Sequence, residues 1–199
     1  MIVQIDIVDV LHFWFGADAE VPREKQRLWW KKSLAFDAEI KKTFGCLHAE
    51  VAEGRHEFWA ENAKGRLALI LIFDQFPRHL YRGQARAYAY DKKALDLCLD
   101  GIEEGHDQEL EGFCRAFYYM PLVHCENASI QEKAVQHLSH YAQTQSLAEK
   151  DAMMGFVRSA RRHQSVIEQF GRFPHRNVLL GRENNDREKE FLKQPGSSF

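Results

Sequence analysis

The sequence has little net charge, no closely paired cysteines and no long apolar run. It carries 27 basic and 29 acidic side chains among 199 residues, so it lacks the excess positive charge of a general nucleic-acid binder. Its longest apolar run, residues 67–73, is far shorter than the roughly 18 residues that a membrane-spanning helix requires. The first ten residues contain two aspartates and no basic residue, unlike a secretory signal. We therefore expect neither a nucleic-acid partner nor a membrane partner.

The four cysteines lie far apart, at positions 46, 98, 114 and 125, and none belongs to a Cys-x-x-Cys pair. This spacing argues against a disulfide framework and a zinc ribbon, and it favours a reducing compartment. Hydrophobic residues make up 45% of the chain, which is too much for a disordered protein. The length suffices for a core without covalent cross-links. We expect a cytoplasmic protein that folds as one domain over residues 1–199.

Common catalytic motifs are also missing. The chain has no glycine-rich phosphate loop, no Gly-x-Ser-x-Gly and no His-Glu-x-x-His. His124-x-Glu126 resembles the first half of a zinc-deaminase motif, but no Pro-Cys-x-x-Cys follows it. The sequence therefore predicts no cofactor and no resident metal, and it names no catalytic residue.

What is present is helical periodicity along almost the whole chain, without the alternation of a β-hairpin. Short connections rich in glycine and proline separate the segments, which is typical of stacked antiparallel helical hairpins. The class is therefore all-α, with residues 183–199 as a polar, partly ordered tail. The expected helices are residues 6–15, 23–54 (one helix, or two joined near Gly45), 65–76 (stopped by Pro77), 88–102 (Asp91 as a cap), 109–127 (kinked at Pro121), 130–141, 151–170 (closed by Gly171) and a short one at 186–192.

Three polar residues fall on apolar helix faces, at Asp74, His124 and His163. A buried carboxylate or imidazole is costly unless it finds a partner, so each must be bonded inside the protein. The functional interpretation is an internal polar pocket lined by Asp74, His124, Glu126, His163, Arg172 and His175. The structural alternative is that each residue only forms hydrogen bonds or ion pairs with its neighbours and has no role in binding.

The loop FGRFPHRN presents Arg172, His175, Arg176 and Asn177 within six residues. Guanidinium groups match phosphate and carboxylate, so this loop suits an anion site. Capping of the preceding helix is the simpler alternative, because basic groups are favourable at a helix C-terminus. In the similar string FDQFPRHLYRG, Arg78 is expected to form an ion pair with Asp74, one helical turn earlier.

Three strings carry a family resemblance: LALILIFDQFPRHLYRG, FYYMPLVHCE and RRHQSVIEQFGRFPHRNVLLGR. Together they resemble the DUF924 family, over essentially the whole chain from Val10. The resemblance implies an all-α, tetratricopeptide-like right-handed array with a concave surface, and it implies no reaction. The family's signature positions correspond to Asp74, Gln75, Arg78, His124, Glu126, His163, Arg172, His175, Arg176 and Asn177. Cys125 stands where the family usually has serine.

Three functional hypotheses follow. The first is a binding protein for a small anion or an acidic peptide end, with charge from Arg78, Arg172, His175 and Arg176 and orientation from His124 and His163. The second is an enzyme that uses His124 or His163 with Asp74 or Glu126 as general acid and base, or as metal ligands. The third is a protein–protein scaffold, in which the polar interior is structural.

Overall fold

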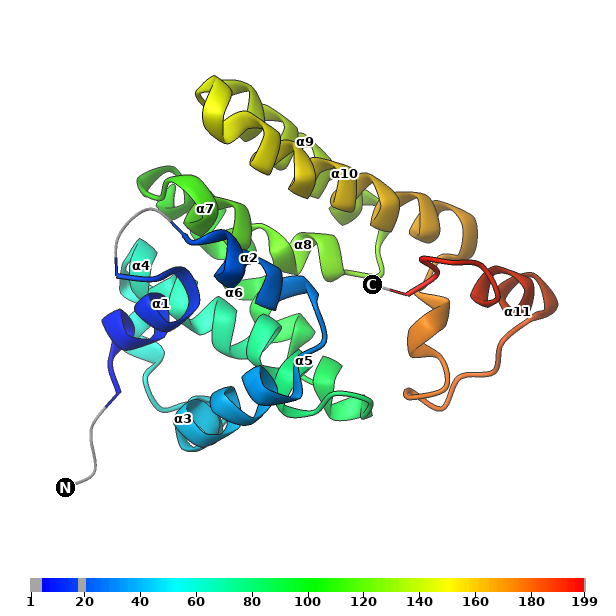
Figure 1. Cartoon of the computed structure of the whole chain (residues 1–199), viewed down its shortest axis with the longest axis horizontal. Helices are drawn as coiled ribbons and strands as arrows, with labels where there is room; N and C mark the ends of the chain where they lie inside the picture. The colour runs from blue at the N-terminus through cyan, green and yellow to red at the C-terminus, as the bar shows by residue number, and fades with distance from the viewer. Residues whose placement is uncertain (1–4, 18–20, 199) are drawn as a thin grey trace. The chain divides into compact units, whose positions relative to one another are not determined.

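The computed structural model describes residues 5–17 and 21–198, and every regular element in these ranges is helical. The all-α prediction is therefore confirmed (Figure 1). The chain divides into two compact units. The first comprises Met1–Arg82 and Ala87–Pro121, and the second comprises Gly83–Arg86 and Leu122–Phe199. The prediction of one domain with a polar tail stays a prediction, as does the tetratricopeptide-like array.

The first unit begins with α1 (Ile7–Phe15), which starts and ends where the sequence predicts. The Asp6 side chain accepts a hydrogen bond from the Asp9 backbone, and the Asp9 side chain accepts one from the Asp6 backbone. This reciprocal pair is a capping box. Gly16 follows the last turn, and its N–H donates to the carbonyl of His12.

The sequence left open one helix over residues 23–54 or two joined near Gly45; the structure has two helices, and they are joined elsewhere. Helix α2 (Arg23–Trp30) ends before residues 31–33, and α3 (Leu34–Ala52) then runs through Gly45 without interruption. The Ser33 side chain accepts a hydrogen bond from the backbone N–H of Phe36, which caps the new helix. A good cap decides the boundary here, because one glycine inside a helix costs only about 1 kcal/mol.

The most buried segment contains a second correction, since Pro77 does not end it. A short 3₁₀ helix η1 (Glu57–Glu61) leads into α4 (Ala63–Ile70), which is capped by Asn62 and begins two residues before Gly65. One π-helical stretch η2 (Leu71–Gln75) follows, and α5 (Phe76–Leu80) continues through the proline. The wider π turn separates the proline ring from the preceding carbonyls, so the helix need not stop.

In the rest of the first unit the predicted helices have other bounds: the one expected from residue 88 begins at residue 91, and the one expected over 109–127 is limited to residues 112–118 and 120–124. Tyr90 is the cap of α6, and Asp91 is the first residue of the helix, where its carboxylate is favourable to the helix dipole. The chain separates α7 from α8 just before Pro121, close to the expected kink. The elements here are η3 (Ala85–Tyr88), α6 (Asp91–Glu103), η4 (His106–Glu109), α7 (Gly112–Tyr118) and α8 (Met120–His124), the last of which continues into the second unit.

Within the first unit, α4 is the central helix, and it packs against α1, α6 and α7. Aromatic rings fill the space beside it. The fully buried Trp14 has Trp29, Phe76 and Phe117 within 6.2 Å between ring centroids. The helical stripe of the sequence thus becomes a core shared by several helices.

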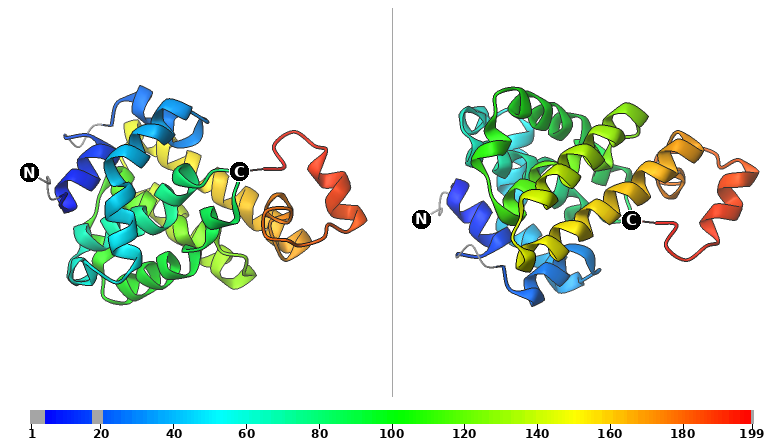
Figure 2. Two further views of the ribbon diagram at one scale, coloured as in Figure 1. Left: turned by 90° about the horizontal axis from the view of Figure 1, so that it is seen from below. Right: turned by 90° about the horizontal axis from the view of Figure 1, so that it is seen from above.

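The second unit contains one long helical hairpin, α9 (Ala128–Thr144) and α10 (Leu147–Phe170), whose helices lie side by side in Figures 1 and 2. Gly171 ends α10 in the left-handed conformation, with φ of 70°, as predicted. A 3₁₀ turn η5 (Pro174–Arg176) and α11 (Asp186–Leu192) complete the unit. Phe173 is fully buried in a small core with Val166 and Ile167.

Two glycines provide a matched test of this fold. A Cβ at Gly45 would meet nothing within 4 Å, so Gly45→Ala should stabilise the protein by about 0.5–1 kcal/mol through better helix propensity. A Cβ at Gly65 would lie 2.2 Å from the carbonyl oxygen of Trp59, so Gly65→Ala should cost about 1–3 kcal/mol. Urea unfolding of both variants measures the difference. Equal stability of the two variants would contradict the helix assignments.

Candidate functional site

The predicted site residues fall in both units. Asp74 and Arg78 belong to the first unit, on η2 and α5. The other seven belong to the second unit, on α8, α10 and the segments that precede α9 and follow α10: His124, Glu126, His163, Arg172, His175, Arg176 and Asn177.

In the first unit, Asp74 is completely buried and bonded by its neighbours. Arg78 Nη1 lies 3.3 Å from Asp74 Oδ1 and also donates to the Asp74 carbonyl, which confirms the predicted pairing. The same guanidinium binds Asp91 at 3.0 Å, and Gln75 donates its amide to Asp74 Oδ2. The arginine therefore joins the π-helical segment to the start of α6.

In the second unit, Glu126 fastens the loop after α10 to the segment before α9. Its Oε1 accepts from the backbone N–H of Phe173 at 2.7 Å, and Arg182 binds both oxygens, at 2.6 and 2.8 Å. Burial alone would raise the pKa of Glu126, but the hydrogen bonds from Arg182 and Phe173 hold it below its usual value. Both carboxylate oxygens of Glu126 thus accept hydrogen bonds, Oε1 from Phe173 and Arg182 and Oε2 from Arg182.

Arg172 holds an internal carboxylate. Its Nε and Nη2 donate to the two oxygens of Glu188 at 2.7 and 2.9 Å, and Nη2 also reaches the carbonyl of Glu183. Glu188 is fully buried, and hydrogen bonds, chiefly from Arg172, lower its pKa to about 2 despite that burial. The same carboxylate forms a capping box with Asn185, so it also starts α11. In this structure Arg172 acts as a cross-link between the loop and α11.

Sequence reasoning missed both partners, Arg182 and Glu188. One signal was available for Glu188, since Asn185-x-x-Glu188 is a capping-box spacing that marks a helix start. Asn177 was predicted as a site residue; it is fully buried and donates its amide to Asn184 at 2.7 Å.

His163 is a buried, neutral imidazole of defined tautomer. Its Nδ1 lies 2.8 Å from the carbonyl of Ser159, which can only accept, so Nδ1 carries the proton and Nε2 carries the lone pair. Burial lowers the pKa of His163 to about 3, with further lowering by His124, Arg176 and His175. The side chain therefore stays uncharged at neutral pH.

Basic side chains gather around Phe173 in a group that we call the Phe173 cluster: His124, His163, Phe173, His175 and Arg176. The ring of His163 lies 5.5 Å from that of Phe173, and His175 lies 5.8 Å from it on centroid distances. The guanidinium of Arg176 is 4.5 Å from the Phe173 ring centroid, and His124 is 6.0 Å from His163. Phe173, His163 and Arg176 are buried, whereas His124 and His175 are partly exposed.

Comparison with known proteins shows the family of this chain. The model of the family described as "Bacterial protein of unknown function (DUF924)" matches residues 10–196. The chain belongs to the DUF924 family. A solved structure of a protein of unknown function, ATU0120 from Agrobacterium tumefaciens, is 32% identical with a TM-score of 0.80. That match covers 94% of the DUF924 chain and 96% of the Agrobacterium chain. No protein with a curated functional description matches the sequence.

The DUF924 chain also contains a carboxylate–imidazole pair that sequence reasoning did not find. In the first unit, His79 Nδ1 lies 2.8 Å from Asp37 Oδ1, and Arg82 binds the same carboxylate through two 2.7 Å contacts. Burial lowers the pKa of His79, although Asp37 opposes that effect. The partners are 42 positions apart, and helical periodicity carries no information on such a pairing.

The described part of the DUF924 chain contains neither a group of metal-ligating side chains nor a membrane-spanning helix. Across residues 5–17 and 21–198, no three His, Cys, Asp or Glu side chains come together as a set that could hold a metal ion. The metal form of the enzyme hypothesis therefore has no ligand set there. None of the helices described is both long enough and apolar enough to cross a membrane.

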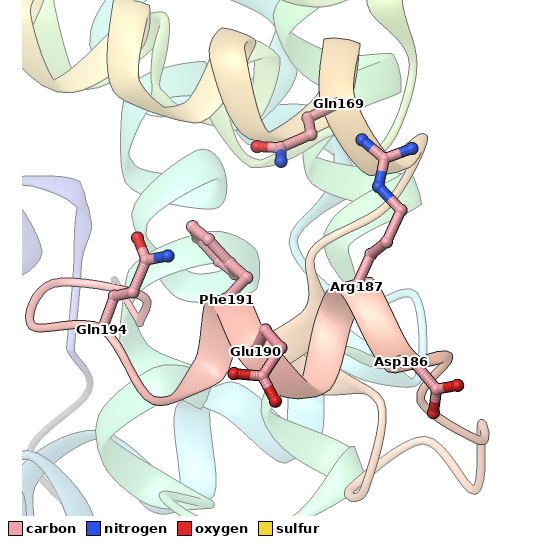
Figure 3. A pocket seen from close by; sticks show the side chains of 6 residues that line it. All are labelled: Gln169, Asp186, Arg187, Glu190, Phe191 and Gln194. Carbon is pink, nitrogen blue, oxygen red and sulfur yellow. The ribbon is translucent and has the colours of Figure 1, made fainter.

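An open depression lies beside α11 in the second unit, between this helix and the end of α10 (Figure 3). Its sides carry Gln169, Arg187 and Phe191, and the Phe191 ring packs 5.0 Å from that of Phe170. Asp186 and Glu190 at its edge are bonded to Lys189 and Lys193. The depression is wide and shallow, and it shares no lining residue with the Phe173 cluster.

The buried neutral His163 predicts acid sensitivity. Its folded pKa lies below the ordinary value near 6.5, so the unfolded chain binds more protons and stability falls as the pH drops from 6.5 toward 3. The loss at pH 5 should be about 2 kcal/mol from this residue. Urea unfolding at pH 7.5 and 5 should show a smaller acid loss in His163→Gln than in wild type. His140→Gln, at an exposed histidine of α9, serves as the control, and an unchanged loss in His163→Gln would contradict the assignment.

Glu126 should be a stabilising cross-link. Glu126→Gln keeps an acceptor for the Phe173 N–H but removes the charge that binds Arg182. We expect a loss of about 1–2 kcal/mol in urea unfolding at pH 7, because about a quarter of the side chain remains exposed. Glu168→Gln on the exposed face of α10 should change stability by less than about 0.5 kcal/mol. Indistinguishable variants would show that the Glu126 contacts do not stabilise the loop.

Proposed function

We propose that the second unit binds a small anion, a phosphate or carboxylate, at the Phe173 cluster. The observation that carries the proposal is the grouping of three basic side chains, His163, His175 and Arg176, around one buried ring, with His124 beside His163. A guanidinium matches either anion geometrically, and an imidazole adds a donor. The anion could belong to a free metabolite or to the acidic end of a peptide.

The electrostatics of His163 support this proposal. Beside burial, the three neighbours that lower its pKa are His124, Arg176 and His175. Burial, the largest cause of the lowered pKa, disfavours charge of either sign, but the repulsion from these three neighbours would turn into attraction for an anion. An anion entering the cluster should therefore raise the pKa of His163 toward its ordinary value.

The ion pairs around the cluster support it in a second way, because they fix the loop before any ligand arrives. Glu126 holds Phe173 and Arg182 on one side, and Arg172 holds Glu188 on the other. Preorganisation of this kind lowers the entropy cost of binding. We accordingly assign Glu126, Arg172 and Asn177 positioning roles, and we assign contact with the ligand to His124, His163, His175 and Arg176. Asp74 and Arg78 remain candidates on the first unit.

The enzyme hypothesis is the second candidate, and the tautomer of His163 favours it. The bond from Nδ1 to Ser159 leaves the lone pair on Nε2, as a general base requires. With a pKa of about 3 this imidazole is a weak base, so the role would need the shift that a bound anion supplies.

The compartment proposed for this function is the cytoplasm. All four cysteines lie in the described residues, and no disulfide joins any of them. Thiols of this kind persist under reducing conditions. The third hypothesis, a protein–protein scaffold, would instead have the second unit bind a protein partner.

Histidine NMR during a pH titration tests the binding proposal, with inorganic phosphate, succinate and, at equal ionic strength, sodium chloride. Phosphate or succinate should raise the pKa of His163 by about one unit, because an opposite charge within reach favours the charged form. In His175→Gln, about ten times more anion should be needed for the same change in the His163 pKa, as expected for the loss of one charge-assisted hydrogen bond. His140→Gln is the matched control on the same unit. Equal responses to chloride and to both anions would overturn the proposal.

A further inference from the structure

The first unit contains a small pocket that takes no part in the proposed function. It lies where the end of α3 and η1 meet α4, η2 and α6. Its volume is about 160 Å³. The walls are formed mainly by apolar side chains and the mouth by three charged ones: Val51, Ala60, Leu69, Phe73 and Leu97, with Arg55, Glu57 and Lys93.

The size of the pocket defines the apolar part of a ligand. An engineered apolar cavity of about 150 Å³ in another protein stays dry and binds benzene. The present pocket is nearly the same size, and its walls include the buried side chains of Val51, Leu69 and Phe73. One benzene-sized group therefore matches the volume of the pocket.

The mouth defines the polar part. Lys93 Nζ lies 4.8 Å from the Phe73 ring centroid, directly beside the apolar wall. Its contact with Glu57 is loose, at 4.0 Å, and both side chains are partly exposed. Arg55 adds a second cation, which Glu53 holds in place at 2.8 Å. Because Arg55 also lies 3.8 Å from Glu50, its charge is balanced by two carboxylates, and Lys93 is the cation at which a ligand whose ring contacts Phe73 can place a carboxylate.

The backbone of the rim is held in an unusual shape. His56 is the one non-glycine residue with positive φ, at 70°, among those that the structure describes, and Gly54 has φ of 90°. The His56 ring packs 5.0 Å from that of Trp59, and its Nε2 lies 3.3 Å from Glu50. A left-handed non-glycine residue persists only when its surroundings hold it, and such residues cluster at binding sites.

We propose that this pocket binds a small aromatic monocarboxylate, with the ring against Phe73 and the carboxylate at Lys93. The site lies entirely in the first unit. Its success or failure is therefore independent of the anion proposed for the second unit.

Amide NMR titration of the full-length protein with phenylacetate, benzyl alcohol and benzylamine tests the proposal. Phenylacetate should shift the resonances of Leu69, Phe73 and Leu97 with the lowest dissociation constant of the three compounds. No shift at these positions up to about 20 mM, or tighter binding of benzylamine, would overturn the proposal.

Two variants assign the contacts. Lys93→Met keeps the apolar stem and should weaken phenylacetate about twofold to fivefold while leaving benzyl alcohol unchanged, as expected for a partly exposed ion pair. Lys92→Met is the matched control, because Lys92 is bonded to Asp96 on the same helix and does not line the pocket. Ala60→Leu should fill the pocket and weaken both compounds about tenfold or more at an unchanged melting temperature. Equal effects of the two lysine variants would refute the role of Lys93.

Discussion

A helical segment that is apolar on every side must be covered on every side, and the first unit is built around that constraint. From Ala63 to Pro77 every residue but Lys64 is buried, so α1, α6 and α7 pack against the segment rather than against water. Its polar groups must then be bonded internally. Arg66 illustrates this, since its guanidinium group donates to the carbonyls of Ala60 and Leu97 and to the Glu104 carboxylate.

The second unit follows a different principle. Its apolar core beyond the α9–α10 hairpin is small, and two carboxylates organise the chain after Gly171. Glu126 fixes the loop, and Glu188 fixes α11. Each accepts a two-pronged arginine contact, the geometry in which ion pairs are most specific. Ion pairs therefore hold the segment that contains the Phe173 cluster. Polar side chains can be accommodated beside ion pairs more easily than inside a closely packed apolar core.

The helical class, the C-terminal ends of α1 and α10, and the burial of Asp74 and His163 could all be predicted from sequence, because they depend on neighbours within two turns. The break at Ser33 and the passage through Pro77 could not, since a cap and a π turn override the simpler glycine and proline rules. Pairings across long separations were also out of reach. Asp37 and His79 meet only because α3 packs on α5, and periodicity does not encode that contact.

The π turn at Leu71–Gln75 has a consequence for how this protein tolerates change in length. A π turn is in effect an α-helix with one residue inserted, so every side chain after it is rotated by about 100° relative to an uninterrupted helix. His79 meets Asp37 in that shifted register. Deletion of a single residue between 71 and 75 would restore a regular helix and carry His79 and Arg82 away from their partner.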